Sequence, residues 1–250
     1  MTDMSRKALI ISDVTAMKGS SVCIAGYDIS LRCIRPVLSV GQIKSRHLFK
    51  DGELIIYPGA KVSFLFRAHN PHPPHIEDYI FDEDTIEPEG KASNAEWKKV
   101  LNNTAVEKLS ELFPDMEERY VPPTARGPSM GTLIPKTLPI ISCDCYGTPR
   151  PKIEIIDYED IVKEKVPITD LAFRSYFDLL MEKYRGDCEK TVKFLNGKLA
   201  HRSIYLRLGL SRPFLNAPGK YSGWCCLQVN GIHTIPDLYD RNYEKWIRLE

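Results

Sequence analysis

The chain has 250 residues, of which 43% are hydrophobic and 27% are charged, the composition of a soluble globular protein with one large domain or two small ones. Its net charge of +1 argues against a protein that binds duplex DNA mainly through phosphates. No apolar run approaches the ~20 residues of a membrane span, and the first residues contain no signal peptide, so we expect a cytoplasmic protein with no membrane partner.

The first third of the chain is predicted to form β-strands. Four runs with strand-like composition are separated by turn residues, and they cover residues 7–12, 21–27, 32–38 and 61–68. In the last run, Val62, Phe64 and Phe66 alternate with polar residues, which predicts that these three side chains face a barrel core.

The middle of the chain is predicted to be helical and then proline-rich. Residues 94–101 should form a helix that buries Trp97, and residues 104–113 a second helix with a capping-box spacing at its start. Residues 120–136 contain four prolines and two glycines and are the best candidate linker. We therefore predict two domains, an N-terminal barrel with a helical segment at residues 1–125 and a C-terminal barrel at residues 126–250.

The second half returns to strands around a helical insertion. Strands are expected at residues 137–145, 152–158, 203–214 and 224–231, and the insertion at residues 174–199, with a break near Arg185. The alternation in 203–214 predicts that its leucines face inward and that Tyr205 and Arg207 face solvent. Two hexamers, C-I-R-P-V-L (33–38) and L-S-R-P-F-L (210–215), suggest that both halves share a similar plan.

Four separated strings carry a family resemblance: V-C-I-A-G-Y-D with L-R-C-I-R-P-V-L, then H-P-P-H-I-E-D-Y, L-G-L-S-R-P-F, and C-L-Q-V-N-G-I-H-T-I-P-D-L-Y. In this order and spacing they resemble a prokaryotic family described as the dual OB-containing domain, from about Lys7 to Tyr239. The resemblance implies a β-rich α+β fold with two OB-like β-barrels and helical insertions. By analogy with OB-folds in general it also implies nucleic-acid binding, and it supplies no established catalytic residue.

The segment H-N-P-H-P-P-H-I-E-D-Y (69–79) contains the candidates for catalysis, His72, His75, Glu77 and Asp78. Imidazoles and carboxylates are metal ligands, but consecutive prolines favour polyproline II geometry, which would place neighbouring histidines ~9 Å apart, too far for two to bind one zinc ion. We therefore predict no metal and no cofactor. The favoured interpretation is a rigid connector whose histidines hydrogen-bond to the neighbouring barrel and whose carboxylates orient a histidine or pair with an arginine.

The outward face of the last two strands is the candidate nucleic-acid site. Tyr205, Arg207, Trp224 and Gln228 would share this face if strands 203–214 and 224–231 are neighbours, and OB-folds stack bases on aromatic rings beside cations. The competing interpretation is that helices 174–199 cover Trp224 and that Arg207 pairs with an acid.

Two further arginines, Arg35 and Arg212, each precede a proline at a strand end. They suit either phosphate contacts or a salt bridge between the barrels, to Glu77, Asp78 or Asp170. The basic run at residues 183–202 could add cationic surface, although its simplest interpretation is the outer face of a helix.

The sequence thus favours a non-catalytic protein that binds single-stranded or structured RNA or DNA. Two alternatives stay open. One is a metal-dependent enzyme acting on nucleic acid or nucleotides, with the histidine segment near a cleft. The other is a protein-interaction subunit of a prokaryotic defence or repair system.

Overall fold

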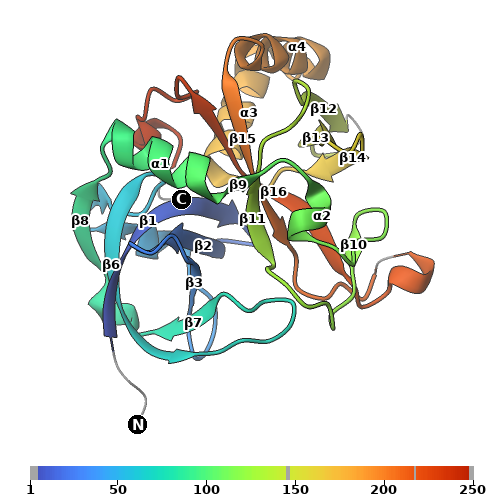
Figure 1. Cartoon of the computed structure of the whole chain (residues 1–250). Helices are drawn as coiled ribbons and strands as arrows, with labels where there is room; N and C mark the ends of the chain where they lie inside the picture. Colours follow the sequence, from blue (N-terminus) through green and yellow to red (C-terminus); the bar gives the residue numbers. More distant parts are fainter. Residues whose placement is uncertain (1–4, 145–146, 217, 248–250) are drawn as a thin grey trace.

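The computed structural model describes residues 5–144, 147–216 and 218–247. Two β-barrels lie side by side, and a helix, α1 (Asn94–Thr104), covers the junction between them (Figure 1). The other helices are α2 (Leu109–Leu112), α3 (Leu171–Lys183) and α4 (Cys188–Leu199). The predicted β-rich fold with two OB-like barrels and helical parts is confirmed.

The first barrel closes on itself. Its strands are β1 (Ser5–Ala16), β2 (Val22–Tyr27), β3 (Cys33–Val37), β6 (Ala60–His69), β7 (Asp78–Phe81) and β8 (Glu87–Lys91). The hydrogen-bonded order is β1-β2-β3-β7-β6, with β3 and β7 parallel and with β6 returning to β1. The first half of β1 pairs with β6 and the second half with β2, so one long strand belongs to both edges of the sheet. This is the connectivity of an OB-fold.

The second barrel repeats this connectivity with its first strand divided in two. Its strands are β11 (Met130–Leu133), β12 (Ile140–Asp144), β13 (Arg150–Ile156), β14 (Val162–Pro167), β15 (Ser203–Leu210) and β16 (Cys225–Ile235). β11 pairs with β15, β12 pairs with β13, and Ile168 after β14 forms a parallel bridge to Val229 of β16. Residues 134–139 interrupt the strand between β11 and β12, so the sheet is open there. Asn196 of α4 covers the open edge, because its side-chain amide bonds both the N–H and the C=O of Ile141.

Short elements complete the two halves. In the first half they are β4 (Phe49–Lys50), β5 (Glu53–Leu54), and the 3₁₀ turns η1 (Ser45–Leu48) and η2 (Glu83–Thr85). In the second they are β9 (Ala105–Val106), β10 (Tyr120–Val121), η3 (Gly219–Tyr221) and η4 (Tyr243–Lys245).

Both predicted core faces are confirmed. Val62, Phe64 and Phe66 lie in the first core, and the leucines of β15 lie in the second. The predicted insertion forms α3 and α4, and the chain breaks between them at Arg185 and Gly186, both of which have positive φ. Trp97 is buried in α1 as predicted.

Two local predictions are wrong. The helix expected at 104–113 is reduced to α2, because Ala105 and Val106 pair with β11 as strand β9; the capping box is instead made by Ser93 and Glu96 at the start of α1. Residues 120–136, expected to be a linker, contain β10 and β11, which pair with β16 and β15. The four prolines all lie outside these two strands, so they mark the turns between strands and not a linker between domains.

Packing also crosses the predicted division between residues 125 and 126. Tyr239, Tyr243 and Ile247 pack in the first core, and Leu109, Leu112 and Phe113 pack in the second. None of the helices formed by the described residues is long and apolar enough to cross a membrane.

Candidate functional site

The outer face of β15 is covered by the first barrel, so part of the predicted nucleic-acid surface is buried. Arg207 is fully buried and Tyr205 is 8% exposed, which shows that the expectation of solvent exposure is wrong for both. Tyr205 packs with Trp97 under α1, and its hydroxyl donates to Asn102 Oδ1 at 2.5 Å. The alternation of side chains identified the inward face of β15 correctly. It could not show that the first barrel packs against the outward face.

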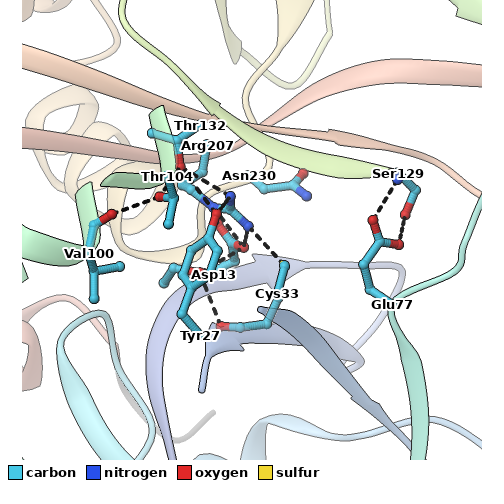
Figure 2. A network of polar contacts seen from close by, with 12 residues as sticks. Asp13, Tyr27, Cys33, Glu77, Val100, Thr104, Ser129, Thr132, Arg207 and Asn230 are labelled. Carbon is cyan, nitrogen blue, oxygen red and sulfur yellow. Dashed lines mark hydrogen bonds and ion pairs between the residues drawn. The ribbon is translucent and has the colours of Figure 1, made fainter. Parts of the chain in front are cut away.

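Arg207 is the centre of a buried polar network between the barrels (Figure 2). Its Nη2 lies 2.7 Å from Asp13 Oδ2, and its Nε lies 2.9 Å from Asp13 Oδ1, a bidentate pair from β15 to β1. Nη1 donates to the Tyr27 hydroxyl and, at 3.2 Å, to Thr132 Oγ1. The Arg207 guanidinium also lies over the Tyr27 ring, 5.0 Å from its centroid. The network therefore fixes the orientation of one barrel against the other.

The electrostatics of this network keep Arg207 charged. Burial by itself would lower the pKa of Arg207, but Asp13, with smaller contributions from Tyr27 and Cys33, outweighs burial and raises that pKa well above its ordinary value. A guanidinium surrounded by protein on every side cannot reach a phosphate. Arg207 is thus a structural residue, as the competing interpretation of the sequence had it.

A second group of polar contacts joins β7 to the second barrel. Asp78 accepts from Arg35 Nε at 2.5 Å and from Arg212 Nη2 at 2.6 Å. Glu77 accepts from the Ser129 N–H and hydroxyl, both at 2.7 Å (Figure 2). The predicted salt bridge between the barrels is therefore made by Arg212, whereas the pair of Arg35 with Asp78 lies within the first barrel.

The two arginines differ in exposure, and their hexamers are not equivalent. The Arg35 side chain is 5% exposed, so the expectation of an exposed guanidinium is wrong there, whereas that of Arg212 is 50% exposed. Arg35 lies within β3, the third strand of its barrel, whereas Arg212 follows β15, the fourth strand of the other barrel. The hexamers do not mark a repeat, yet the two arginines meet at one carboxylate.

The histidine segment forms a tight turn between β6 and β7 and not an extended polyproline helix. The Pro73–Pro74 peptide is cis, and the His75 N–H donates to the His72 carbonyl at 2.6 Å. His69 and His72 are exposed and bond carbonyls of their own loop, at Ile76 and Asn70, so the expected bonds to the other barrel are not made. No group of three or more possible metal ligands occurs among residues 5–144, 147–216 and 218–247.

His75 differs from His69 and His72 because it is buried. Its ring lies near the Ser211 backbone without a hydrogen bond of normal geometry to any described residue. Burial, followed by the positive charges of Arg35 and Arg212, lowers the pKa of His75 to about 3. His75 is therefore neutral, Glu77 is bonded to Ser129, and Asp78 is paired with two arginines. These residues stabilise the junction between the barrels.

The exposed aromatic surface is a hairpin that the sequence prediction did not resolve. The connection from β15 to β16, of which residues 211–216 and 218–224 are described, projects from the second barrel at the lower right of Figure 1, and we call it the 211–224 hairpin. Phe214 and Trp224 are directly paired across the hairpin through a bond from the Phe214 N–H to the Trp224 carbonyl at 3.0 Å. Phe214 is 49% exposed and Trp224 is half-buried. Because directly opposed residues point to the same face, Phe214 and Trp224 share one face of the hairpin, which we call the aromatic platform.

Supporting residues hold this platform in place. The Tyr221 ring meets the Trp224 ring edge-on with centroids 5.4 Å apart, and it stacks on the Tyr120 ring at 4.6 Å. Two cations lie over this stack: Arg119, 5.5 Å from the Tyr120 ring centroid, and Lys220, 5.1 Å from the Tyr221 ring centroid. Phe214 was missed because it was assigned to the end of a strand; the signal was an aromatic residue on each side of the A-P-G-K turn.

Two further predicted contributors lie elsewhere. Gln228 is half-buried on the same side of β16 as Trp224, paired with Gly209, so it continues the platform toward the barrel. The basic run forms the end of α3 and α4, at the top of Figure 1, far from the hairpin. Its lysines lie over their own aromatic neighbours, such as Lys198 over Phe194, which supports the interpretation as an outer helix face.

Comparison with known families gives one result for the whole fold. Residues 7–232 match a family described as the dual OB-containing domain. No curated protein matches the chain. The matched range contains both barrels, the network around Arg207, the histidine segment and the hairpin.

Proposed function

Because the chain belongs to the dual OB-containing domain family, we propose that it binds single-stranded or structured RNA or DNA through the 211–224 hairpin of its second barrel. OB-folds use the face of strands 2 and 3 with the loops after strands 1 and 4 to bind oligonucleotides. The hairpin is the loop after the fourth strand of the second barrel. The observation that carries the proposal is the Phe214–Trp224 platform, a directly opposed aromatic pair in which Phe214 is exposed and Trp224 is half-buried.

The chemistry of the hairpin suits unpaired bases. An aromatic ring stacks on any base, at ~1–3 kcal/mol per base, and it can do so only where the base is not already stacked inside a duplex. Arg212 at the base of the hairpin and Lys220 near its tip supply positive charge for phosphates. Arg212 is held by Asp78, so part of its guanidinium is already oriented before any ligand arrives.

The charge of the chain bears on affinity. Few cations lie near the platform, and Lys220 is paired with Glu117. Binding should therefore be modest and should depend weakly on salt, since the slope of affinity against salt reports the number of phosphates neutralised.

The test is fluorescence anisotropy with labelled single-stranded DNA and RNA at 50 and 200 mM salt. We expect binding at low salt that weakens about 5- to 100-fold in Phe214→Ala, the loss of one stacked base. Tyr158→Ala is the matched control, because Tyr158 is an aromatic residue of similar exposure, 45%, on the turn after β13. No binding at low salt, or equal losses in both variants, would overturn the proposal.

A further inference from the structure

A cavity of about 340 Å³ lies away from the hairpin, where the first barrel meets α3. Its walls come from four separate parts of the chain: residues 16–22 around the turn between β1 and β2, Ser45 at the start of η1, residues 171–179 of α3, and Lys245 with Trp246. The turn is the loop after the first strand of the first barrel, one of the two loops that frame ligands in OB-folds. The volume falls within the ~300–1,000 Å³ of small-molecule sites.

Several residues that line the cavity carry hydrogen-bond donors without a hydrogen bond to the described residues. Burial raises the pKa of Asp178 and the positive charge of Arg174 partly offsets this, but the Arg174 side chain forms no hydrogen bond or salt bridge with any described residue. Ser20, Ser45 and Ser175 line the same cavity, and none of their hydroxyls bonds to another side chain or backbone group in the described part of the chain. An arginine and several serines that line one cavity can supply the donors that recognise phosphate oxygens.

The remaining lining residues define what else the ligand carries. Lys245 also lines the cavity, and Asp178 is the one carboxylate among the lining residues. Trp246, which packs edge-on against Tyr176 with ring centroids 4.6 Å apart, contributes a fixed indole, and Met17 and Leu171 add apolar surface. A carboxylate can accept a hydrogen bond from a sugar hydroxyl, and an indole can contact a planar ring.

We propose that this cavity binds a phosphate monoester attached to a sugar, with Arg174 as the principal phosphate ligand and the serine hydroxyls as additional donors. The inference goes beyond the function proposed above, because it concerns a different site and holds whether or not the hairpin binds nucleic acid. Two sources share this chemistry, a free nucleoside monophosphate and the phosphorylated 5′ end of a nucleic-acid strand.

The experiment is calorimetric titration of the full chain with adenosine 5′-monophosphate and with adenosine, beside anisotropy with 5′-phosphorylated and 5′-hydroxyl oligonucleotides of the same sequence. We expect at least tenfold tighter binding of the phosphorylated member in one of the two pairs. That pair identifies the source. The Arg174→Ala variant should lose at least tenfold of this binding, and Arg174→Lys should retain part of it.

Two further variants keep the test decisive. Ser175→Phe would place a ring in the cavity and should abolish binding, whereas Lys183→Ala removes a cation from the same helix outside the lining and should leave binding unchanged. Circular dichroism and thermal melting establish that each variant is folded. Equal affinity for phosphorylated and unphosphorylated probes in both pairs, or full binding by Arg174→Ala, would overturn the proposal. Loss of oligonucleotide binding in Phe214→Ala with intact Arg174-dependent binding would separate this cavity from the hairpin.

Discussion

The junction between the barrels and the hairpin of the second barrel use the same kinds of residue in opposite ways. At the junction, Arg207 and Tyr27 are closed off from water and bonded to each other. At the hairpin, Arg212, Phe214 and Trp224 lie at the surface or close to it. Both regions belong to β15 and its continuation toward β16, a few residues apart.

The difference is caused by what packs over each region. The first barrel and α1 cover the outer face of β15, whereas the hairpin extends beyond them. A guanidinium that is covered must be paired, because an unpaired buried charge costs several kcal/mol. A guanidinium at the surface can bind a ligand. Residue type alone therefore does not identify a binding site. Whether another element covers the side chain determines whether that side chain can contact a ligand.

The largest effect should come from breaking the junction. Arg207→Ala leaves the Asp13 carboxylate buried without its cation, and we expect the free energy of unfolding to fall by ~3–5 kcal/mol. Urea denaturation measures this loss. The double variant Asp13→Leu with Arg207→Met should recover much of it, because it removes both charges. A loss below 1 kcal/mol in Arg207→Ala would contradict the assignment of Arg207 as the centre of the junction.

The next largest effect should be a dependence of folding stability on pH that is caused by His75. Its folded-state pKa of about 3 lies below the ordinary 6.5, so the unfolded chain binds the extra proton first as pH falls. Stability should therefore decrease below pH 6.5, by about 2 kcal/mol between pH 7 and pH 5, and the loss should cease near pH 3. Asp170, whose pKa burial raises to about 7, acts in the opposite direction.

The contribution of His75 is isolated by comparing each variant with the wild type, because the contributions of the other titrating groups are the same in both proteins and cancel in the difference. His75→Phe should remove this loss between pH 7 and pH 5, as measured by urea denaturation at both values. His72→Phe, an exposed position in the same turn, should keep the wild-type dependence. Identical pH dependence in the His75 variant and the wild type would show that His75 is not kept neutral by the junction.

Arg212 lies between the junction and the hairpin, and its substitution should have an intermediate effect on folding stability. Arg212→Ala removes a half-exposed partner of Asp78 but leaves the buried partner Arg35, so we expect a loss of about 1 kcal/mol in stability. Affinity for single strands should fall as well, and Arg212→Lys should restore part of both. A variant that loses binding but no stability would place Arg212 with the hairpin alone.

The smallest effect on stability is expected at the platform. Phe214→Ala removes an exposed ring and should change the free energy of unfolding by no more than ~0.5 kcal/mol. Thermal melting and urea denaturation of the same preparation used for binding measure this directly. A destabilisation above 2 kcal/mol would mean that the ring is part of the fold, and the contrast between junction and hairpin would fail.

The sequence predicted elements with local signals and failed where distant segments meet. Val62, Phe64 and Phe66 were assigned to the core because their period of two is visible within one strand. Arg207 was assigned to solvent by the same rule, because nothing near it in sequence shows that Asp13 and Tyr27 cover it. The helix expected at 104–113 was lost to pairing of Ala105 and Val106 with β11, another contact between distant segments.

The candidate site followed the same pattern. Strand alternation placed Trp224 on the outward face, and the pairing of an arginine with Asp78 was foreseen as one of two roles. Phe214 was not among the predicted residues because its position depends on the partner across the hairpin, and the cavity near Arg174 could not be predicted because four separate segments line it.

The segment at Tyr239, Tyr243 and Ile247 packs in the core of the first barrel although it follows the last strand of the second. A fragment that contains only the second barrel would therefore expose these three side chains, and a fragment that contains only the first would lack part of its interior. Denaturation should accordingly proceed as a single cooperative transition, and proteolysis between the barrels should yield no half that remains folded.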